Sequence, residues 1–209
     1  MKKIYACLLL FISSTTVILA QNDPAAKKVL DAVGAKVKAA KGISANCSLS
    51  SFTSKGKSNG TQVVSLQMKD NKYFIKQGKT EVICDGINVY RFDGEKTITK
   101  SSVEEGSHTL SPQKLLSGSY DKDFTYKMVS TAGNFYEIEM KPIDPKKNFQ
   151  KVSLFIDKSK STFSKAKILD KSNNVTEVKM SDLNLSATIP DTKFVFSKAR
   201  YPKDVEILD

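Results

Sequence analysis

The segment from Thr80 to Thr99, TEVICDGINVYRFDGEKTIT, is the part of the sequence that most constrains the fold. Two Asp-Gly pairs, at 85–86 and 93–94, separate short runs in which apolar and polar residues alternate. Asp-Gly between alternating runs is a strong β-hairpin signal, because both residue types tolerate the positive φ angles of a tight turn. The segment therefore predicts sequential antiparallel strands, and we interpret the aspartates as turn residues in preference to catalytic acids.

The same alternation continues through most of the chain. Apolar residues occupy every second position from Ile43 to Leu49, and TQVVSLQM places Val64, Leu66 and Met68 on one face. Further strand-like segments are KYFIK, FTYKMV, NFYEIEMK, KVSLFID, FSKAKILD, VTEVKMSDLNL, KFVF and VEIL. Many strands with short connections predict a mainly β protein built on a single antiparallel meander sheet, and a sheet of that size curls instead of lying flat.

Two helices are expected beside the strands. Asp23 can cap a helix that has Pro24 at its first position, and Gly42 can end it. Apolar residues recur between them at helical spacing, at positions 29, 30, 33, 37 and 40. A second, short helix is expected from Ser111 to Leu116, ended by Gly118. Because the sequence contains no repeat and no flexible linker, residues 21–209 are expected to form a single domain.

The first twenty residues have the layout of a secretory signal peptide: two lysines, a mostly apolar run and a small residue, Ala20, before Gln21. Cys7 lies too early to be a lipidation site. We therefore expect a periplasmic protein. The formal net charge is +11, but the lysines are dispersed and are not interleaved with aromatic residues, so nucleic-acid binding is not expected. Such a surface suits an anionic membrane or an acidic partner protein.

Catalytic and metal sites find little support in the sequence. The one histidine, His108, lies in the polar segment EEGSHTLSP, and no catalytic motif surrounds it. Asp121 and Asp123 in SYDKDF come nearest to a metal site, and we interpret them as a solvated loop. Cys47 and Cys84 are expected to be core-facing strand residues, with a disulfide between them as the less favoured alternative. The prediction is a protein that is not an enzyme and has no catalytic residues, metal or cofactor.

Several strands carry bulky apolar residues on both faces, as in KYFIK and KVSLFID. One interpretation is a core with some aromatic residues on the outside, which is common. The other is a curved sheet whose concave face encloses a cavity for an acyl chain or another apolar ligand. The pattern of residues alone leaves both open, and it also leaves open which strand face points inward.

The order of motifs resembles the LolA family of periplasmic lipoprotein carriers. The similarity runs from the exported start and the helix at 24–41 through ANCSLSSF, ICDGINVYRFD, SPQKLLSG and KPIDPKKNFQKVSLFID to VTEVKMSDLNLSATIPDTKFVF and YPKDVEILD. The resemblance implies an incomplete β-barrel with a helical lid over an apolar cavity. It also implies a monomeric carrier that takes lipoproteins from an inner-membrane release complex, shields their acyl chains and delivers them to an outer-membrane acceptor.

On this basis the residues expected to contact lipid are Leu49, Leu66, Met68, Tyr73, Ile75, Val82, Cys84, Tyr90 and Phe92. The chain departs from the family at Ile75, where well-known members carry an arginine that bonds to the lid. The alternatives are an exported envelope-sensing or protein-binding module of the same fold that carries no lipid, or, more remotely, a secreted hydrolase.

Overall fold

A computed structural model describes residues 22–105, 110–116 and 120–209. It contains one twelve-stranded sheet, two α-helices and two short 3-10 helices within those residues. The helices are α1 (Pro24–Ala39), α2 (Pro112–Leu116), η2 (Asp191–Phe194) and η3 (Lys198–Arg200). The strands are β1 (Ile43–Phe52), β2 (Ser58–Lys69), β3 (Lys72–Gln77), β4 (Thr80–Cys84), β5 (Asn88–Phe92), β6 (Thr97–Ser102), β7 (Phe124–Ser130), β8 (Phe135–Pro142), β9 (Phe149–Asp157), β10 (Thr162–Asp170), β11 (Val175–Asn184) and β12 (Glu206–Leu208).

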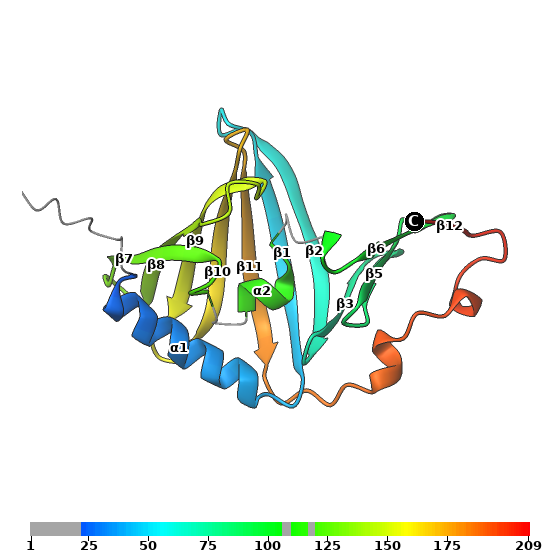
Figure 1. Ribbon diagram of the computed structural model, residues 1–209, viewed down its shortest axis with the longest axis horizontal. Coiled ribbons are helices and arrows are strands. Elements are labelled where there is room, and N and C mark those ends of the chain that lie inside the picture. The colour runs from blue at the N-terminus through cyan, green and yellow to red at the C-terminus, as the bar shows by residue number, and fades with distance from the viewer. Residues whose placement is uncertain (1–21, 106–109, 117–119) are drawn as a thin grey trace, which may run out of the picture.

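The sheet consists of two antiparallel meanders, β1–β6 and β7–β11, joined where β1 pairs with β11. The strand order is β12-β6-β5-β4-β3-β2-β1-β11-β10-β9-β8-β7. It departs from a pure antiparallel meander at β12, which pairs with β6 in parallel. Figure 1 shows the sheet bending sharply along β1, β2 and β11, so that β3–β6 and β7–β10 spread to opposite sides. The predicted open, curved and mainly antiparallel sheet is confirmed.

Both Asp-Gly pairs lie in turns between consecutive strands, as predicted. Only the glycines adopt positive φ angles, 98° at Gly86 and 94° at Gly94, and the aspartates do not. The Asp85 carboxylate accepts hydrogen bonds from the backbone N–H groups of residues 87 and 88, at 2.8 and 2.7 Å. Asp93 likewise accepts from the N–H groups of residues 95, 96 and 97. These carboxylates satisfy turn donors that would otherwise be unpaired, which explains why the residues stand there.

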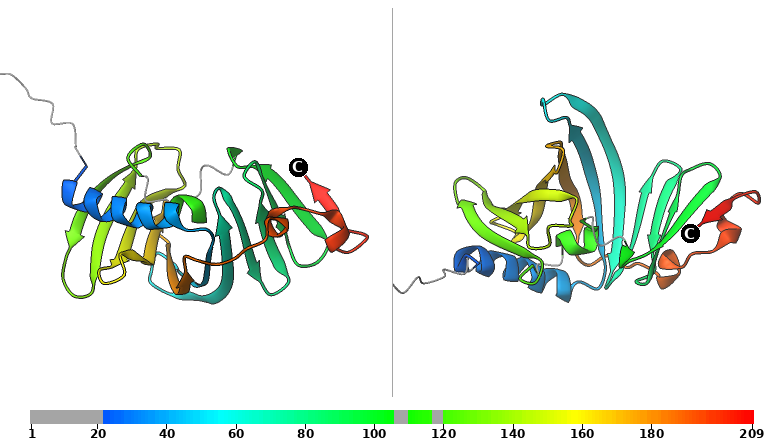
Figure 2. Two further views of the ribbon diagram at one scale, coloured as in Figure 1. Left: turned by 90° about the horizontal axis from the view of Figure 1, so that it is seen from below. Right: turned by 45° about the horizontal axis from the view of Figure 1, so that its top comes forward.

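One face of the sheet carries the main core, and we call it the inner face. Alternate residues of β1 and β2 point into it, as the sequence predicts, and helix α1 contributes Ala26, Leu30 and Val33. Figures 1 and 2 show α1 crossing the ends of the β7–β11 half, with α2 between the two halves. Helix α2 adds the buried residues Leu115 and Leu116. The two helices therefore cover the inner face.

The opposite, outer face of β3–β6 is covered by residues 187–205, which we call the C-terminal arm. Phe194 packs with Phe74 and Ile83 in a small second core, and Val205 packs with Phe92 and Ile98 in a third. Figure 2 shows the arm running along this half of the sheet.

The arm corrects one prediction, because KFVF is not a strand. Pro190 lacks an N–H and is followed by the 3-10 helix η2, which places Phe194 against the sheet face instead of in the hydrogen-bond ladder. Phe196 follows and stacks on Tyr90, with ring centroids 4.3 Å apart. Alternating phenylalanines can thus pack a segment on a sheet without extending it.

The two cysteines of the described region are unpaired. Cys47 in β1 and Cys84 in β4 are both buried and free, as small core-facing strand residues. Burial raises the pKa of the Cys47 thiol to about 11. The thiol therefore stays protonated near neutral pH and behaves as an apolar group.

The start of α1 is tied to β7 through Asp23. One carboxylate oxygen caps the helix by accepting from the Ala25 and Ala26 N–H groups, and the other accepts from the Met128 N–H at 2.9 Å. These hydrogen bonds hold the pKa of Asp23 below its ordinary value of 3.8, and the bond from the Met128 N–H has the largest effect. A depressed pKa means that the ionised form is favoured by folding.

We therefore expect Asp23→Asn to lower the thermal midpoint at pH 7. The stabilisation from the Asp23 charge is complete above the unfolded-state pKa and is lost as the pH falls through the lower folded-state pKa. The difference between parent and variant should accordingly shrink as the pH drops below 3.8. Thermal unfolding at a series of pH values checks this, and a difference that stays constant down to acid pH would contradict the assigned bonds.

Among the residues that the structure describes, no helix combines the length and the hydrophobicity needed to cross a bilayer. The expected signal peptide at 1–20, His108 and Gly118 lie outside the described residues.

Candidate functional site

A groove of about 570 Å³ opens on the inner face, between the two halves of the sheet and beside α2. Strands β3, β4 and β5 form one wall, and the starts of β7 and β9 form the other. The groove is lined by Tyr73, Ile75, Val82, Val89, Arg91, Ser101, Val103, Leu110, Ser111, Pro112, Gln113, Lys114, Asp123, Phe124, Lys147 and Phe149. Its volume lies in the usual range of small-molecule binding sites.

The first wall is built from two cross-strand rows. Ile75 lies opposite Val82, which in turn lies opposite Arg91. In the neighbouring row, Tyr73 lies opposite Cys84, and Cys84 opposite Val89. Because side chains alternate between the two faces of a strand, the members of both rows point to the inner face. Ile75 and Val82 are only partly buried, so they offer apolar surface to the groove.

Most of the residues expected to contact lipid share this inner face. Tyr73, Ile75 and Val82 line the groove itself. Four others, Leu49, Leu66, Met68 and Cys84, belong to the main core or pack against it.

Tyr90 and Phe92 do not share that wall, and their expected placement there is corrected. Both are on the outer face, where Tyr90 stacks on Phe196 and Phe92 packs against Tyr201 with ring centroids 4.9 Å apart. The physical reason is strand parity, since they occupy the positions of β5 that alternate with Val89 and Arg91. The C-terminal arm covers them on that face. Because both faces of β5 are covered, an aromatic residue in this strand does not indicate which face its side chain is on.

Sequence reasoning missed the second wall and the charged groups. Phe124 and Phe149 come from the starts of β7 and β9 and meet across the core, with ring centroids 6.1 Å apart. Each stands at a strand start after a loop, where alternation is short and gives no direction. Arg91 lies two residues after Val89 in β5 and therefore on the same face. This alternation was the one sequence signal that could have placed Arg91 in the groove.

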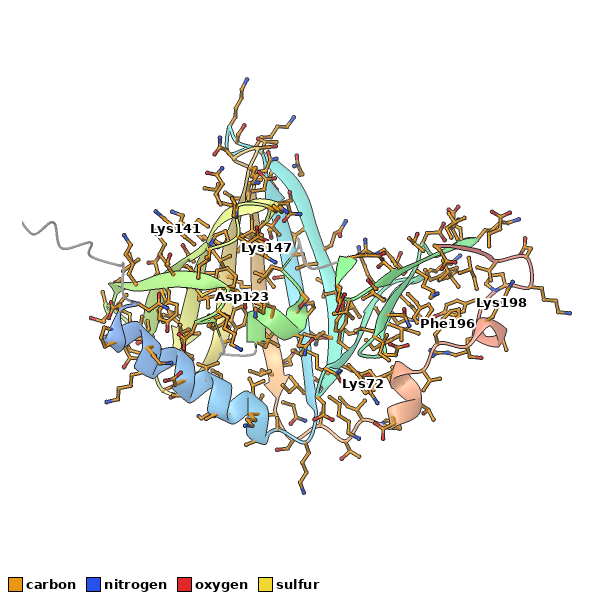
Figure 3. The ribbon with its side chains drawn as sticks, viewed as in Figure 1. Lys72, Asp123, Lys141, Lys147, Phe196 and Lys198 are labelled. Carbon is orange, nitrogen blue, oxygen red and sulfur yellow. The ribbon has the colours of Figure 1, made fainter. Side chains whose placement is uncertain are left out.

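Four charged residues line the groove, and we call this set its mouth: Arg91, Lys114, Asp123 and Lys147. Their net charge is positive. Lys114 of α2 forms an ion pair with Asp123, and Lys147 and Arg91 add two further positive charges. Figure 3 shows Asp123 and Lys147 near the middle of the molecule, beside α2. Within the described residues, neither a hydrogen bond nor an ion pair is found for the Arg91 side chain. The groove thus joins an apolar wall to a net positive mouth.

The phenol of Tyr73, in the neighbouring row of the first wall, is affected by both burial and charge. Burial raises the pKa of its phenol to about 12, while the positive charge of Arg91 acts in the opposite direction. The phenol therefore stays neutral, and the Arg91 guanidinium is close enough to influence it.

The aspartates of SYDKDF are engaged with protein groups. Asp121 forms a 2.8 Å ion pair with Lys27 of α1 and accepts a hydrogen bond from the Tyr126 hydroxyl. The Lys27 ammonium is the first cause that lowers the pKa of Asp121. Among the described residues, no group of three or more His, Cys, Asp or Glu side chains is arranged to hold a metal ion.

Comparison with known families identifies the relationship. The family model described as "Outer membrane lipoprotein carrier protein LolA" matches residues 75–197, which is more than half of the chain. The chain belongs to the LolA family. The match to this LolA model begins at Ile75 in the groove wall and ends in the C-terminal arm, so it includes β4–β11 and both α2 and η2.

The chain is also similar to solved structures. An uncharacterised conserved protein from Thermus thermophilus is 11% identical, with a TM-score of 0.56 over 88% of this chain and 98% of that one. A LolA superfamily protein from Nitrosomonas europaea is 14% identical, with a TM-score of 0.47 over 82% and 97%. The lipoprotein LppX from Mycobacterium tuberculosis is 15% identical, with a TM-score of 0.47 over 81% and 100%. A search of curated proteins gives no match.

Proposed function

We propose that this LolA-family protein is a non-enzymatic periplasmic carrier that shields the acyl chains of lipoproteins between the inner and outer membranes. The observation that carries the proposal is the groove, whose volume is about 570 Å³ and whose wall presents partly buried aliphatic side chains. An acyl chain placed there would bury its own apolar surface together with that of Ile75 and Val82, at roughly 25 cal/mol per Å².

The proposal assigns the parts of the molecule as follows. Residues 1–20 would be the export signal, and residues 21–209 a single monomeric domain. Tyr73, Ile75 and Val82 would contact the acyl chain directly, with Leu49, Leu66, Met68 and Cys84 supporting the wall from the core. Helices α1 and α2 would act as the lid, since they are the helices that cover the inner face. Donor and acceptor would be an inner-membrane release complex and an outer-membrane receptor.

The fold itself supports a role in which the groove changes its content. Helix α2 is only five residues long, and the residues that it buries are Leu115 and Leu116. Short elements with few buried groups are the ones that open at low free-energy cost. A cover of this kind suits a carrier that must take up and release its cargo.

Native mass spectrometry tests the proposal. The full chain is expressed in a bacterium with its own start, recovered from the periplasm and measured under gentle conditions. We expect a fraction of the protein to carry an acylated species, and the Ile75→Asp variant to carry none. Protein free of lipid that co-purifies instead with a protein partner would overturn the carrier proposal and favour the protein-binding alternative.

A further inference from the structure

The groove combines an apolar wall with an arginine that has no acceptor. Arg91 is exposed, projects from the row that contains Ile75 and Val82, and has no hydrogen-bond or ion-pair partner among residues 22–105, 110–116 and 120–209. An arginine usually finds a carboxylate or phosphate for its planar, forked set of donors. At this position the missing acceptor can come from a ligand.

The surrounding charges point the same way. Of the other charged groups that line the groove, Asp123 is already neutralised by Lys114, and Lys147 is positive. The mouth therefore has a net positive charge, which complements a negative group and repels a cationic one. The apolar wall begins beside it, since Val89 is two residues before Arg91 on the same face.

The size of the groove limits the ligand. Its volume of about 570 Å³ lies in the range of sites that bind one small ligand. One long unbranched chain with a compact head is a ligand of that size.

We propose that the groove also binds a second class of ligand, a free amphiphile with one long acyl chain and a carboxylate head, the carboxylate being bound by Arg91. This rests on the proposed function only in that the chain lies in the same groove, because the acyl chains of a lipoprotein are linked as esters or amides and carry no free carboxylate. The chain lies along the Ile75–Val82 wall, and the carboxylate accepts two hydrogen bonds from the guanidinium at the mouth. Lys147 adds a second positive charge on the opposite wall.

Isothermal titration of the lipid-free full-length mature protein tests this with two probes of equal chain length, palmitate and hexadecanol, both below their aggregation limits. We expect palmitate to bind about tenfold more tightly than hexadecanol. Its binding should weaken as the salt concentration is raised. In Arg91→Leu the preference should vanish, with hexadecanol binding unchanged. Arg91→Lys should keep part of it, because the charge remains and the fork is lost.

Lys57→Leu is the matched control, since it removes one positive charge from an exposed site at the far tip of the β1–β2 hairpin and should keep the full preference. Equal binding of both probes by the parent, or a preference that survives in Arg91→Leu, would overturn the assignment of the head while leaving the chain-binding groove in place. If neither probe binds the parent, the groove proposal itself fails. The outcomes therefore separate the two proposals.

Discussion

Ile75→Asp should abolish binding of an acyl-chain probe while leaving the protein folded. Ile75 faces the groove, is only partly buried and lies between Leu66 and Val82 in its cross-strand row. Losing its contact with a chain removes about 1.5–3 kcal/mol, and covering an unpaired carboxylate with a chain costs several kcal/mol more. We expect the dissociation constant for a neutral fluorescent lipid to rise by roughly a hundredfold or more.

Val63→Asp provides the matched control. Val63 lies on β2, its side chain is 66% exposed, and the same chemical change there adds a carboxylate to a solvated surface. Both variants should keep the parent's circular dichroism spectrum, which is measured before binding. A folded Ile75→Asp protein that binds the probe as tightly as Val63→Asp would show that the chain does not lie along this wall.

Phe194→Ala should strongly destabilise the protein although the residue lies outside the groove. Phe194 is 1% exposed, and it fills the space between the C-terminal arm and the outer face of the sheet, against Phe74 and Ile83. Truncating a buried phenylalanine costs about 3–5 kcal/mol of unfolding free energy. For a domain of this size the thermal midpoint should fall by roughly 6–20 °C. Binding of the lipid probe well below the new midpoint should not change, because the residue is on the other face.

The neighbouring residue supplies the comparison. Val195 is 57% exposed, so Val195→Ala should alter the unfolding free energy by less than about 0.5 kcal/mol. Thermal unfolding followed by circular dichroism measures both variants. If the two alanine variants melt together, the arm is not packed on the sheet in solution, and the outer face of β3–β6 is open.

Local sequence signals predicted the strands well, because each depends on a few neighbouring residues. Asp85-Gly86 and Asp93-Gly94 fix their turns with bonds that span only two to four positions. Alternation likewise placed Val64, Leu66 and Met68 on one buried face. Local signals do not indicate which distant segment packs on a given face of the sheet. Nothing in NVYRF tells which of its faces meets the groove and which meets the C-terminal arm, more than one hundred positions later, where Tyr90 packs on Phe196 (196 − 90 = 106).

The candidate site shows the same limit more strongly. Its first wall follows from β3 and β4, where Tyr73, Ile75 and Val82 were expected. Its second wall needs Phe124 and Phe149, and these reach the groove because the sheet bends along β1, β2 and β11, which leaves the groove between its two halves. Arg91 could be read as an exposed strand residue until the register placed it in the Ile75–Val82 row. The bend and the register are properties of the complete sheet.

The joint between the two meanders also bears on how the molecule folds. Within each meander the strands pair with their neighbours in sequence, so each can grow from its own turns on the time scale of hairpin formation, about 1–10 μs per hairpin. Pairing β1 with β11 is different, because Cys47 lies opposite Met180, 133 positions later (180 − 47), and closing so long a loop is slow. The groove takes one wall from each meander and therefore exists only after this step. A ligand held between the walls binds only the state in which β1 and β11 are paired. Binding therefore stabilises this pairing, which forms last, more than the pairings within each meander.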